Sequence, residues 1–323
     1  MMRLKEQGIS ILPIVNPGRL GLERMRLSFN LSRDIPDPYV LFGGLHQKAG
    51  LHYFARSMLS QSFDSEFMIP KGSRPALLKL LRALEEMKMV ENVSIEKILW
   101  KEILMMRTKL YDYEEGNWDV DFSKLSGDPS IGIPSLPDDD SYDRTDLLII
   151  KEIQMDPWIK VVDLASKFGM TEGDAAYHLN RHVFGRSQVP SFRFKWVGTR
   201  EAWSKHTIVG MTLFFRALSD EISRRAMSVM TSTPFTWSHM RGEAGTYLSE
   251  LLVPVGYFPE TLHYISENLR PLGIKPEVQL IDYSCVGNYT IPHEMYDKES
   301  GWKLDPEKSL GYVLQMIKTY SKQ

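Results

Sequence analysis

Two histidines, His178 and His182, lie four residues apart in a stretch with helical periodicity. On a helix this spacing places two imidazoles on one face, where both can bind a single metal ion. The sequence indicates no third ligand nearby, and one of the two rings is expected to face the protein core or DNA. We therefore predict neither a metal site nor a cofactor.

Two glutamates, Glu66 and Glu250, occupy equivalent positions in two similar stretches of sequence. The first stretch reads FDSEFMIPKGSRPALL from Phe63, and the second reads YLSELLVPVGYFPETL from Tyr247. Matched carboxylates in two copies can line a ligand pocket, or they can share a salt bridge between the copies. The salt bridge is the more ordinary interpretation.

Basic side chains are concentrated between residues 186 and 205, although the chain as a whole has 39 Lys and Arg against 41 Asp and Glu. A net charge of −2 excludes a surface that attracts polyanions everywhere, so any nucleic-acid contact must come from a local patch. Such a patch can hold the DNA backbone, which gives affinity but little sequence information. The basic residues are Arg186, Arg193, Lys195, Arg200 and Lys205, against the single acidic Glu201.

The chain contains an internal duplication with a period close to 184 residues, shown by matched pairs on either side of the two glutamates. A repeat of this length requires the same elements in the same order in both copies. The pairs include Ser65 with Ser249, Pro70 with Pro254, Gly72 with Gly256, and Pro75 with Pro259.

Each copy is expected to fold as strand, helix, strand, strand, helix, strand. In the second copy, β-branched and apolar runs predict strands over 207–215, 235–243, 247–253 and 277–286, with helices over 219–230 and 259–269. In the first copy the strands are 25–31, 51–58, 63–69 and 93–100, with helices over 39–46 and 74–87. This βαββαβ order is the ferredoxin-like arrangement, a four-stranded antiparallel sheet with two helices on one side.

Between the copies lies a segment with three helical periods, over 144–154, 161–168 and 171–183. Gly169 is suited to a left-handed turn, and Thr171 is suited to cap the third helix. A short helix, a glycine turn and a further helix form the helix-turn-helix pattern, in which the second helix can enter the DNA major groove.

This segment resembles the winged helix-turn-helix of the Lrp/AsnC (leucine-responsive, feast/famine) transcription regulators. The residues that carry the resemblance are Asp143, Asp146, the apolar run 149–153, Leu164 with Ala165, Gly169 and Thr171. In that family a βαββαβ ligand-binding domain follows the winged domain, as expected here. The resemblance covers about residues 143–290 and, through the repeat, residues 22–105. It implies a prokaryotic, archaeal-type regulator that binds double-stranded DNA as a homodimer.

The resemblance also implies the residues of two sites. The third helix begins with Glu172 and Asp174, which would repel phosphates, so the downstream basic residues are expected to hold the DNA backbone. For a small-molecule effector, Gly245 matches the family pattern, but Leu248 stands where an aspartate is expected. The expected DNA-binding residues are Thr171, Tyr177, His178, Asn180, Arg181, Arg186, Arg193, Lys195 and Arg200, and the weaker effector candidates are Asp64, Glu66, Gly245 and Glu250.

The predicted fold class is α+β, with a winged helix-turn-helix plus two ferredoxin-like (βαββαβ) domains in one chain. Residues 1–21 are interpreted as the tail and wing of a first winged domain, whose preceding helices are lost or truncated. The expected domains are 22–110 (ferredoxin-like domain 1), 111–142 (arm and linker), 143–204 (winged helix-turn-helix), 205–295 (ferredoxin-like domain 2), and 296–323 (C-terminal arm and helix).

From these patterns we predict a sequence-specific DNA-binding transcription regulator and no enzyme. With Cys285 as its only cysteine and no apolar run of membrane-spanning length, the chain is expected to be cytoplasmic and without a membrane partner. Two alternatives stay open. One is a sensor or interaction protein that keeps the scaffold without binding DNA. The other is an Lrp-like haem-pathway enzyme, because some relatives of this architecture are decarboxylases.

Overall fold

The computed structural model describes residues 9–32, 35, 37–60, 62–104, 110–112, 117–125, 142–196, 208–216 and 218–320. Within these ranges the elements expected from the repeat are present in the expected order. The first copy has β2 (Leu22–Leu31), α2 (Pro38–Ala49), β3 (Leu51–Ser57), β4 (Ser62–Pro70), α3 (Arg74–Glu86) and β5 (Val90–Ile103). The second has β9 (Ile208–Phe215), α7 (Asp220–Ser232), β10 (Thr236–Gly242), β11 (Tyr247–Pro254), α8 (Phe258–Leu269) and β12 (Glu277–Asn288).

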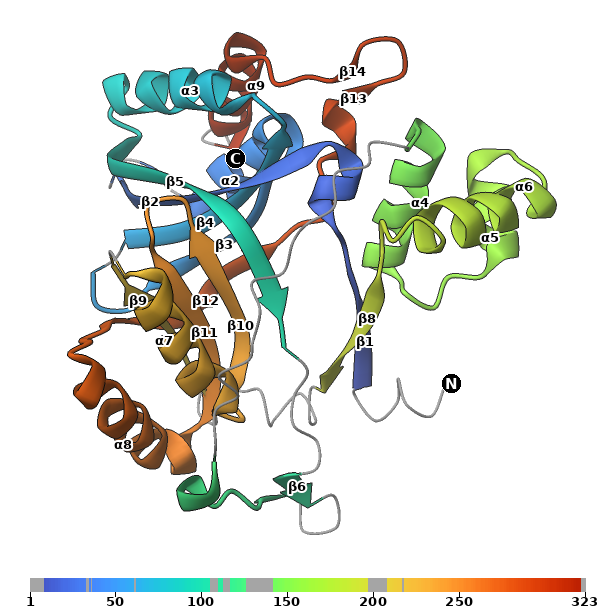
Figure 1. Ribbon diagram of the computed structural model, residues 1–323. Coiled ribbons are helices and arrows are strands. Elements are labelled where there is room, and N and C mark those ends of the chain that lie inside the picture. Colours follow the sequence, from blue (N-terminus) through green and yellow to red (C-terminus); the bar gives the residue numbers. More distant parts are fainter. Residues whose placement is uncertain are drawn as a thin grey trace.

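The eight strands of the two copies form one closed barrel, with α2 and α3 outside one half and α7 and α8 outside the other (Figure 1). Around the barrel the strands follow the order β10-β11-β9-β12-β3-β4-β2-β5. β5 pairs with β10 and β3 pairs with β12, both antiparallel, so the outer strands of each four-stranded half are joined to the other half. Closure pairs the backbone groups that two separate sheets would expose at their edges.

Alternation along the strands separates an apolar outer layer from an interior that holds charged side chains beside a small apolar cluster of Ile98, Phe214, Met240 and Leu248. On β2, Met25, Leu27 and Phe29 belong to the apolar core beneath α2 and α3. The intervening residues Arg24 and Arg26 therefore project to the other side, into the barrel, because successive side chains of a strand point to opposite faces. A closed barrel thus buries both faces of its strands, and its interior holds charged side chains.

The C-terminal helix α9 (Pro306–Tyr320) covers α2 and α3 (Figure 1). It therefore packs on helices of the same chain. A Cβ added to Gly44 of α2 would lie 3.0 Å from a methyl carbon of Val313 and 3.3 Å from its Cα. The glycine therefore lets the two helix backbones approach closely.

Three helices stand beside the barrel, on the right in Figure 1. They are α4 (Arg144–Met155), α5 (Val161–Phe168) and α6 (Glu172–Tyr177), and α6 continues as the π-helix η4 (His178–Phe184). Gly169, at φ 63°, ends α5 in the left-handed conformation expected for the turn. A two-stranded ribbon of β1 (Ile9–Ile14) and β8 (Ser191–Trp196) lies between these helices and the barrel.

Two short hairpins repeat the acidic and aromatic segments that follow the last strand of each copy. They are β6 (Tyr111–Asp112) with β7 (Asn117–Trp118), and β13 (Tyr296–Asp297) with β14 (Gly301–Trp302). Trp302 packs against the apolar core of the helical segment, and its Nε1 donates a 2.6 Å hydrogen bond to the carbonyl of Leu20. The second hairpin thus joins the helical segment to the chain just before β2 through Trp302.

None of the helices in the described ranges is long and apolar enough to cross a membrane. Residues 1–8 of the expected first winged segment and residues 126–141 of the expected linker lie outside the described residues.

Replacing Gly50 by alanine is expected to destabilise the fold far more than replacing Gly72. Both glycines have left-handed backbones, at φ 80° and 78°, where a side chain costs about 1–2 kcal/mol. At Gly50 a Cβ would also overlap the carbonyl oxygen of Met68, whereas nothing lies within 4 Å at Gly72. We expect Gly50→Ala to lose about 3 kcal/mol or more in urea unfolding and Gly72→Ala about 1 kcal/mol. Equal losses would contradict the close approach at Gly50.

Candidate functional site

Lys101 of β5 lies inside the barrel between two carboxylates, Glu66 on β4 and Glu250 on β11. Its Nζ contacts Glu66 Oε1 and lies 3.4 Å from Glu250 Oε2. Arg24 Nη1 lies 3.3 Å from Glu66 Oε2, and the hydroxyl of Ser238 donates to Glu250. We call these five residues the barrel cluster. The salt bridge expected between the two copies is confirmed, with Lys101 as the shared cation.

The charges of the barrel cluster hold one another ionised. Burial alone would raise the pKa of Glu66, but Lys101 and Arg24 lower it to about 2. Burial opposes the charge of Lys101, but Glu250 and Glu66 outweigh it and raise the pKa of the ammonium group. The neighbouring imidazole of His52 is neutral, because burial and the charge of Arg24 lower its pKa to about 3.

A second buried ion pair, between Arg26 of β2 and Asp64 of β4, lies in the same interior. Arg26 Nε lies 2.9 Å from Asp64 Oδ1, and the guanidinium carbon lies 4.3 Å from the centre of the Phe214 ring. Burial raises the pKa of Asp64 to about 6, although Arg26 opposes the shift. Asp64 is therefore a carboxyl group that exchanges its proton close to neutral pH.

Arg193, on the ribbon strand β8, is also buried, with 1% of its surface exposed. Its Nη1 donates a 3.2 Å hydrogen bond to the carbonyl of Trp237, and the guanidinium lies over the Trp237 ring. Its Nε and Nη2 have no hydrogen-bond partner in the described part of the chain. Burial lowers the pKa of Arg193 to about 9 against the opposing charge of Glu250. A buried guanidinium with two free nitrogens is a site for an anion that can accept both hydrogen bonds.

Arg193 and the described part of the barrel interior together carry more positive than negative groups. There are four cations and three carboxylates, and the difference grows when Asp64 binds a proton. Buried charges are costly unless they are paired, so an uncompensated cation favours an anionic ligand. The cations are Arg24, Arg26, Lys101 and Arg193, and the carboxylates are Asp64, Glu66 and Glu250.

Of the effector candidates predicted from sequence, the structure brings Asp64, Glu66 and Glu250 together inside the barrel but not Gly245. Gly245 lies in the turn between β10 and β11 at φ 75°, where its N–H donates to the carbonyl of Gly242. Its role is to make the turn.

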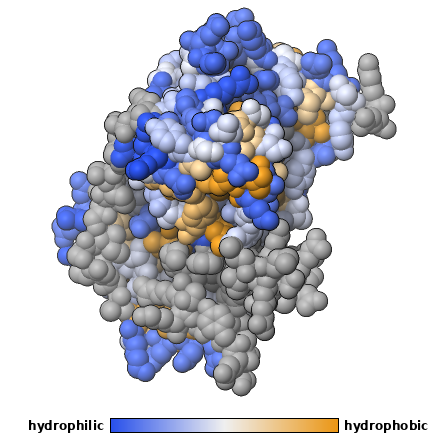
Figure 2. Space-filling model, turned by 90° about the vertical axis from the view of Figure 1, so that its right-hand side faces the viewer, coloured by the Kyte–Doolittle hydropathy of each residue, from blue (hydrophilic) through white to orange (hydrophobic). Residues whose placement is uncertain are grey.

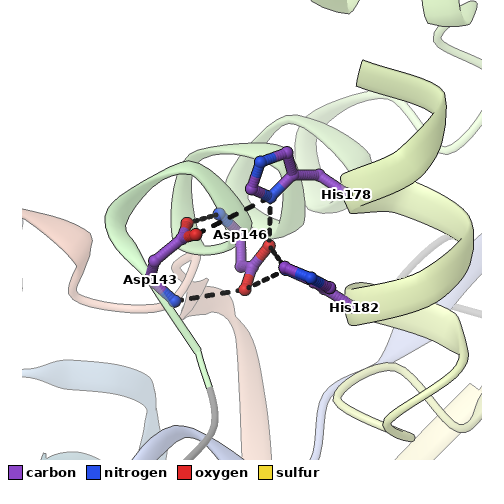
Figure 3. A group of neighbouring side chains, drawn as sticks. All are labelled: Asp143, Asp146, His178 and His182. Carbon is purple, nitrogen blue, oxygen red and sulfur yellow. Dashed lines mark hydrogen bonds and ion pairs between the residues drawn. The ribbon is translucent and has the colours of Figure 1, made fainter. Parts of the chain in front are cut away.

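The residues expected to contact DNA are divided between the surface and the interior. Thr171 caps α6 by accepting a hydrogen bond from the N–H of Asp174, and the side chains of Tyr177, Asn180 and Arg181 are exposed. The imidazole of His178 instead faces Asp146 of α4, so it is not available to a base edge (Figure 3).

The basic patch is likewise not a continuous surface. Arg193 was expected to hold the DNA backbone from an outer wing, but it is buried against Trp237 and does not lie on the outer surface along which a DNA backbone would run. Arg186 is half-buried. Lys195 lies on β8, but the structure describes only its backbone. Arg200 lies outside the described residues. Figure 2 shows that the end of the molecule with the helical segment is largely hydrophilic, with a small hydrophobic area.

Sequence reasoning missed the cations of the interior. Lys101, Arg24 and Arg26 were not singled out, and Arg193 was assigned to the outer surface. A signal for Arg24 and Arg26 was present, because they alternate with apolar residues on β2, which pairs with β4, the strand that carries Glu66. Where helices cover one face of the strands and a second sheet covers the other, the polar residues of such a pattern face a closed interior and not solvent.

Comparisons with known proteins give a fold but no family. No protein family matches the sequence, and no curated protein matches it. The siroheme decarboxylase NirDL aligns over 99% of this chain and 87% of its own, with a TM-score of 0.57 and 11% identity. The same enzyme in co-complex with an iron-uroporphyrin III analogue aligns over the same shares, with a TM-score of 0.55 and 11% identity.

An AsnC family transcriptional regulator from Agrobacterium tumefaciens aligns over 46% of this chain and 94% of its own, with 20% identity. Its TM-score of 0.34 is too low to support an argument. The regulator role implied by the resemblance is therefore not shown.

The prediction that the chain is not an enzyme is overturned. Two solved structures that align over 99% of the chain are those of an enzyme, a decarboxylase. The sequence pattern misled because one scaffold can serve both regulators and enzymes, so the motif fixes the fold and not the function. Across its whole described length, the chain shares its α+β fold with siroheme decarboxylase NirDL.

Proposed function

We propose that this protein is an enzyme that removes a carboxyl group from a tetrapyrrole of the siroheme class. The observation that carries the proposal is Arg193, a buried guanidinium that has two nitrogens without a hydrogen-bond partner among the described residues. Tetrapyrroles of this class carry several carboxylates, which such a site can bind in pairs of hydrogen bonds. The full-length fold likeness to a siroheme decarboxylase supports the choice of substrate.

We infer further that the architecture consists of two ferredoxin-like domains, over 22–110 and 205–295, and a winged helix-turn-helix over 143–204. The βαββαβ order of each copy and the position of the β1–β8 ribbon support this division. In this arrangement the winged segment supplies Arg193 to the barrel, so it contributes to the site rather than standing apart from it.

The chemistry assigns separate tasks to the buried groups. Decarboxylation breaks the bond between the substrate carbon and its carboxylate, releases CO2, and leaves an electron pair on the carbon, which then takes a proton. Arg193 binds a second carboxylate and holds the ring in place. Asp64, whose pKa is about 6, donates the proton and regains one from solvent. The barrel cluster fixes the surrounding charges before the reaction begins.

Replacing Arg193 by glutamine is expected to weaken the binding of iron uroporphyrin III at least tenfold. The change removes the positive charge and the paired hydrogen bonds to a substrate carboxylate, and charged hydrogen bonds of this kind contribute about 1.5–3 kcal/mol. Binding is measured by titration, following the porphyrin absorbance. Arg181→Gln, on the exposed face of η4, is the control and should bind as the wild type does. Equal affinity of Arg193→Gln and wild type would overturn the assignment of Arg193.

A second candidate function is sequence-specific DNA binding by α6 and η4. The left-handed turn at Gly169 between α5 and α6, with Tyr177, Asn180 and Arg181 exposed beyond it, favours this function. Because operators read in this way are palindromic, it would require a homodimer to present two helices. The exposed acidic residues Glu172 and Asp174 at the start of α6 oppose it. An electrophoretic shift with promoter DNA tests it: binding that weakens steeply with salt and with Arg181→Ala supports it.

A further inference from the structure

We propose that Asp143, Asp146, His178 and His182 form a binding site for one zinc ion, independent of the barrel interior. Each side chain offers one ligand atom, and these four atoms lie within 4.8 Å of one another. Figure 3 shows the two carboxylates at the start of α4 facing the two imidazoles of η4. The His spacing was visible in the sequence, but the third and fourth ligands come from a helix more than thirty residues away.

The two aspartates are held in place by a capping box at the N-terminus of α4. Asp143 Oδ1 accepts a hydrogen bond from the N–H of Asp146, and Asp146 Oδ2 accepts one from the N–H of Asp143. Each carboxylate thus uses one oxygen for the helix cap. The other oxygens, Asp143 Oδ2 and Asp146 Oδ1, are directed toward the histidines. The backbone therefore preorganises two oxygen ligands.

The two imidazoles converge on the same carboxylate oxygen. His178 Nδ1 lies 2.8 Å from Asp146 Oδ1, and His182 Nδ1 lies 3.1 Å from it. The histidines are four residues apart in a π-helix, a rare element that often occurs at functional sites. His178 Nδ1 also lies 3.8 Å from Asp143 Oδ2, so both carboxylates are within reach of one ring.

The donor set matches zinc in charge and in kind. Two carboxylates balance a divalent cation, and two nitrogens with two oxygens are ligands that zinc takes in tetrahedral sites. With bonds of about 2.0–2.1 Å, neighbouring ligand atoms lie about 3.3 Å apart, so small side-chain rotations suffice to close the group around an ion. Asp146 is fully buried, but 51% of the Asp143 side chain and 20% of the His178 side chain are exposed. An ion can therefore enter from solvent.

Without a metal, the same group would be a hydrogen-bond hub in which the two imidazoles donate to a buried carboxylate. The two interpretations differ in measurable ways. A group held by hydrogen bonds alone binds no zinc, whereas the proposed site binds one ion per chain, which links the start of α4 to η4. Because the ion binds the folded chain, zinc raises the melting temperature in a concentration-dependent way.

The test uses the untagged full chain, stripped with a chelator and then titrated with Zn²⁺ by calorimetry. We expect one ion per chain at micromolar or lower Kd and a rise in Tm that the chelator reverses. A second probe is Co²⁺, whose visible absorption bands report tetrahedral coordination. Failure of the wild-type chain to bind zinc at micromolar concentrations would overturn the proposal.

Two variants locate the site. Asp143→Asn keeps a good helix cap, since an asparagine side-chain oxygen also accepts from the N–H of Asp146, but it removes one charged ligand. His182→Gln removes a nitrogen ligand. We expect zinc binding at least tenfold weaker in both, with helix content unchanged in Asp143→Asn by circular dichroism. His263→Gln, an exposed histidine of α8, is the control and should bind zinc as the wild type does. Wild-type affinity in Asp143→Asn and in any folded His182→Gln would place the ion elsewhere and overturn the proposal.

Discussion

Replacing Lys101 by methionine is expected to lower the free energy of unfolding by about 3–5 kcal/mol, because it leaves Glu66 and Glu250 buried side by side without their shared cation. Methionine keeps most of the volume of the side chain, so the loss reports charge rather than a cavity. Urea unfolding, followed by circular dichroism, measures it. Adding Glu250→Gln to Lys101→Met should recover much of the stability, because the cluster is then neutral again and Glu66 keeps Arg24 as its counter-charge.

A matched control is available on the surface. Lys79 Nζ lies 2.9 Å from Glu307, but 64% of the lysine side chain is exposed. Lys79→Met is therefore expected to leave the free energy of unfolding almost unchanged, because exposed ion pairs contribute little to stability. A loss of similar size for Lys101→Met would show that the interior is open to water and that the barrel cluster is not an electrostatic unit.

Replacing Asp64 by asparagine is expected to reduce kcat for decarboxylation by about 10²–10⁴, the usual contribution of a positioned proton donor. Because the pKa of Asp64 is about 6, the wild-type rate should fall as the pH rises through 6, where the carboxyl group loses its proton. The variant should lose that part of the pH profile. The measurement is kcat as a function of pH, from about pH 5 to about pH 8.

Asp282→Asn is the control for Asp64, because Asp282 also pairs with an arginine, Arg56, but at the partly exposed junction of β3 and β12. Its rate and pH profile should match the wild type. An unchanged profile in Asp64→Asn would remove Asp64 from the reaction while leaving Arg193 as a binding residue.

The shifted pKa values of Asp64 and Glu66 make the free energy of unfolding depend on pH. The pKa of Asp64 is raised from 3.8 to about 6 in the folded chain, so its contribution is present below pH 3.8 and is lost as the pH rises through 6. The pKa of Glu66 is lowered from 4.5 to about 2, so its contribution is present above pH 4.5 and is lost as the pH falls toward 2. The Glu66 contribution grows with pH between about 2 and 4.5 and the Asp64 contribution falls between 3.8 and about 6, so the two oppose each other only between 3.8 and 4.5.

The local elements followed from sequence because their signals are local. The helix predicted over 161–168 has the same bounds in the structure. Thr171 and Ser219 cap the helices that follow them, because each side chain accepts a hydrogen bond from an N–H of the first turn. The repeat carried these assignments from the clearer copy to the other. Even the helix interrupted by Gly43 and Gly44 is present, since Gly44 is needed where α9 packs closely.

The site was only partly predictable, because it depends on pairing between strands far apart in the chain. Glu66 and Glu250 were identified from the repeat, and the salt bridge between copies was expected, but its cation could not be named without the β5–β10 pairing. Arg193 looked like a surface residue in a basic stretch, and only the position of β8 beside β10 shows that it is buried. The partner of His178 was likewise hidden until α4 and η4 were placed together.

The most direct test of the central claim is to incubate the purified chain with siroheme and analyse the tetrapyrrole by mass spectrometry. We expect a product that has lost a carboxyl group as CO2, formed in proportion to the amount of protein and absent with Arg193→Gln. Siroheme that binds to the chain but is recovered unchanged, under conditions in which the protein is folded, would contradict the proposed decarboxylase activity.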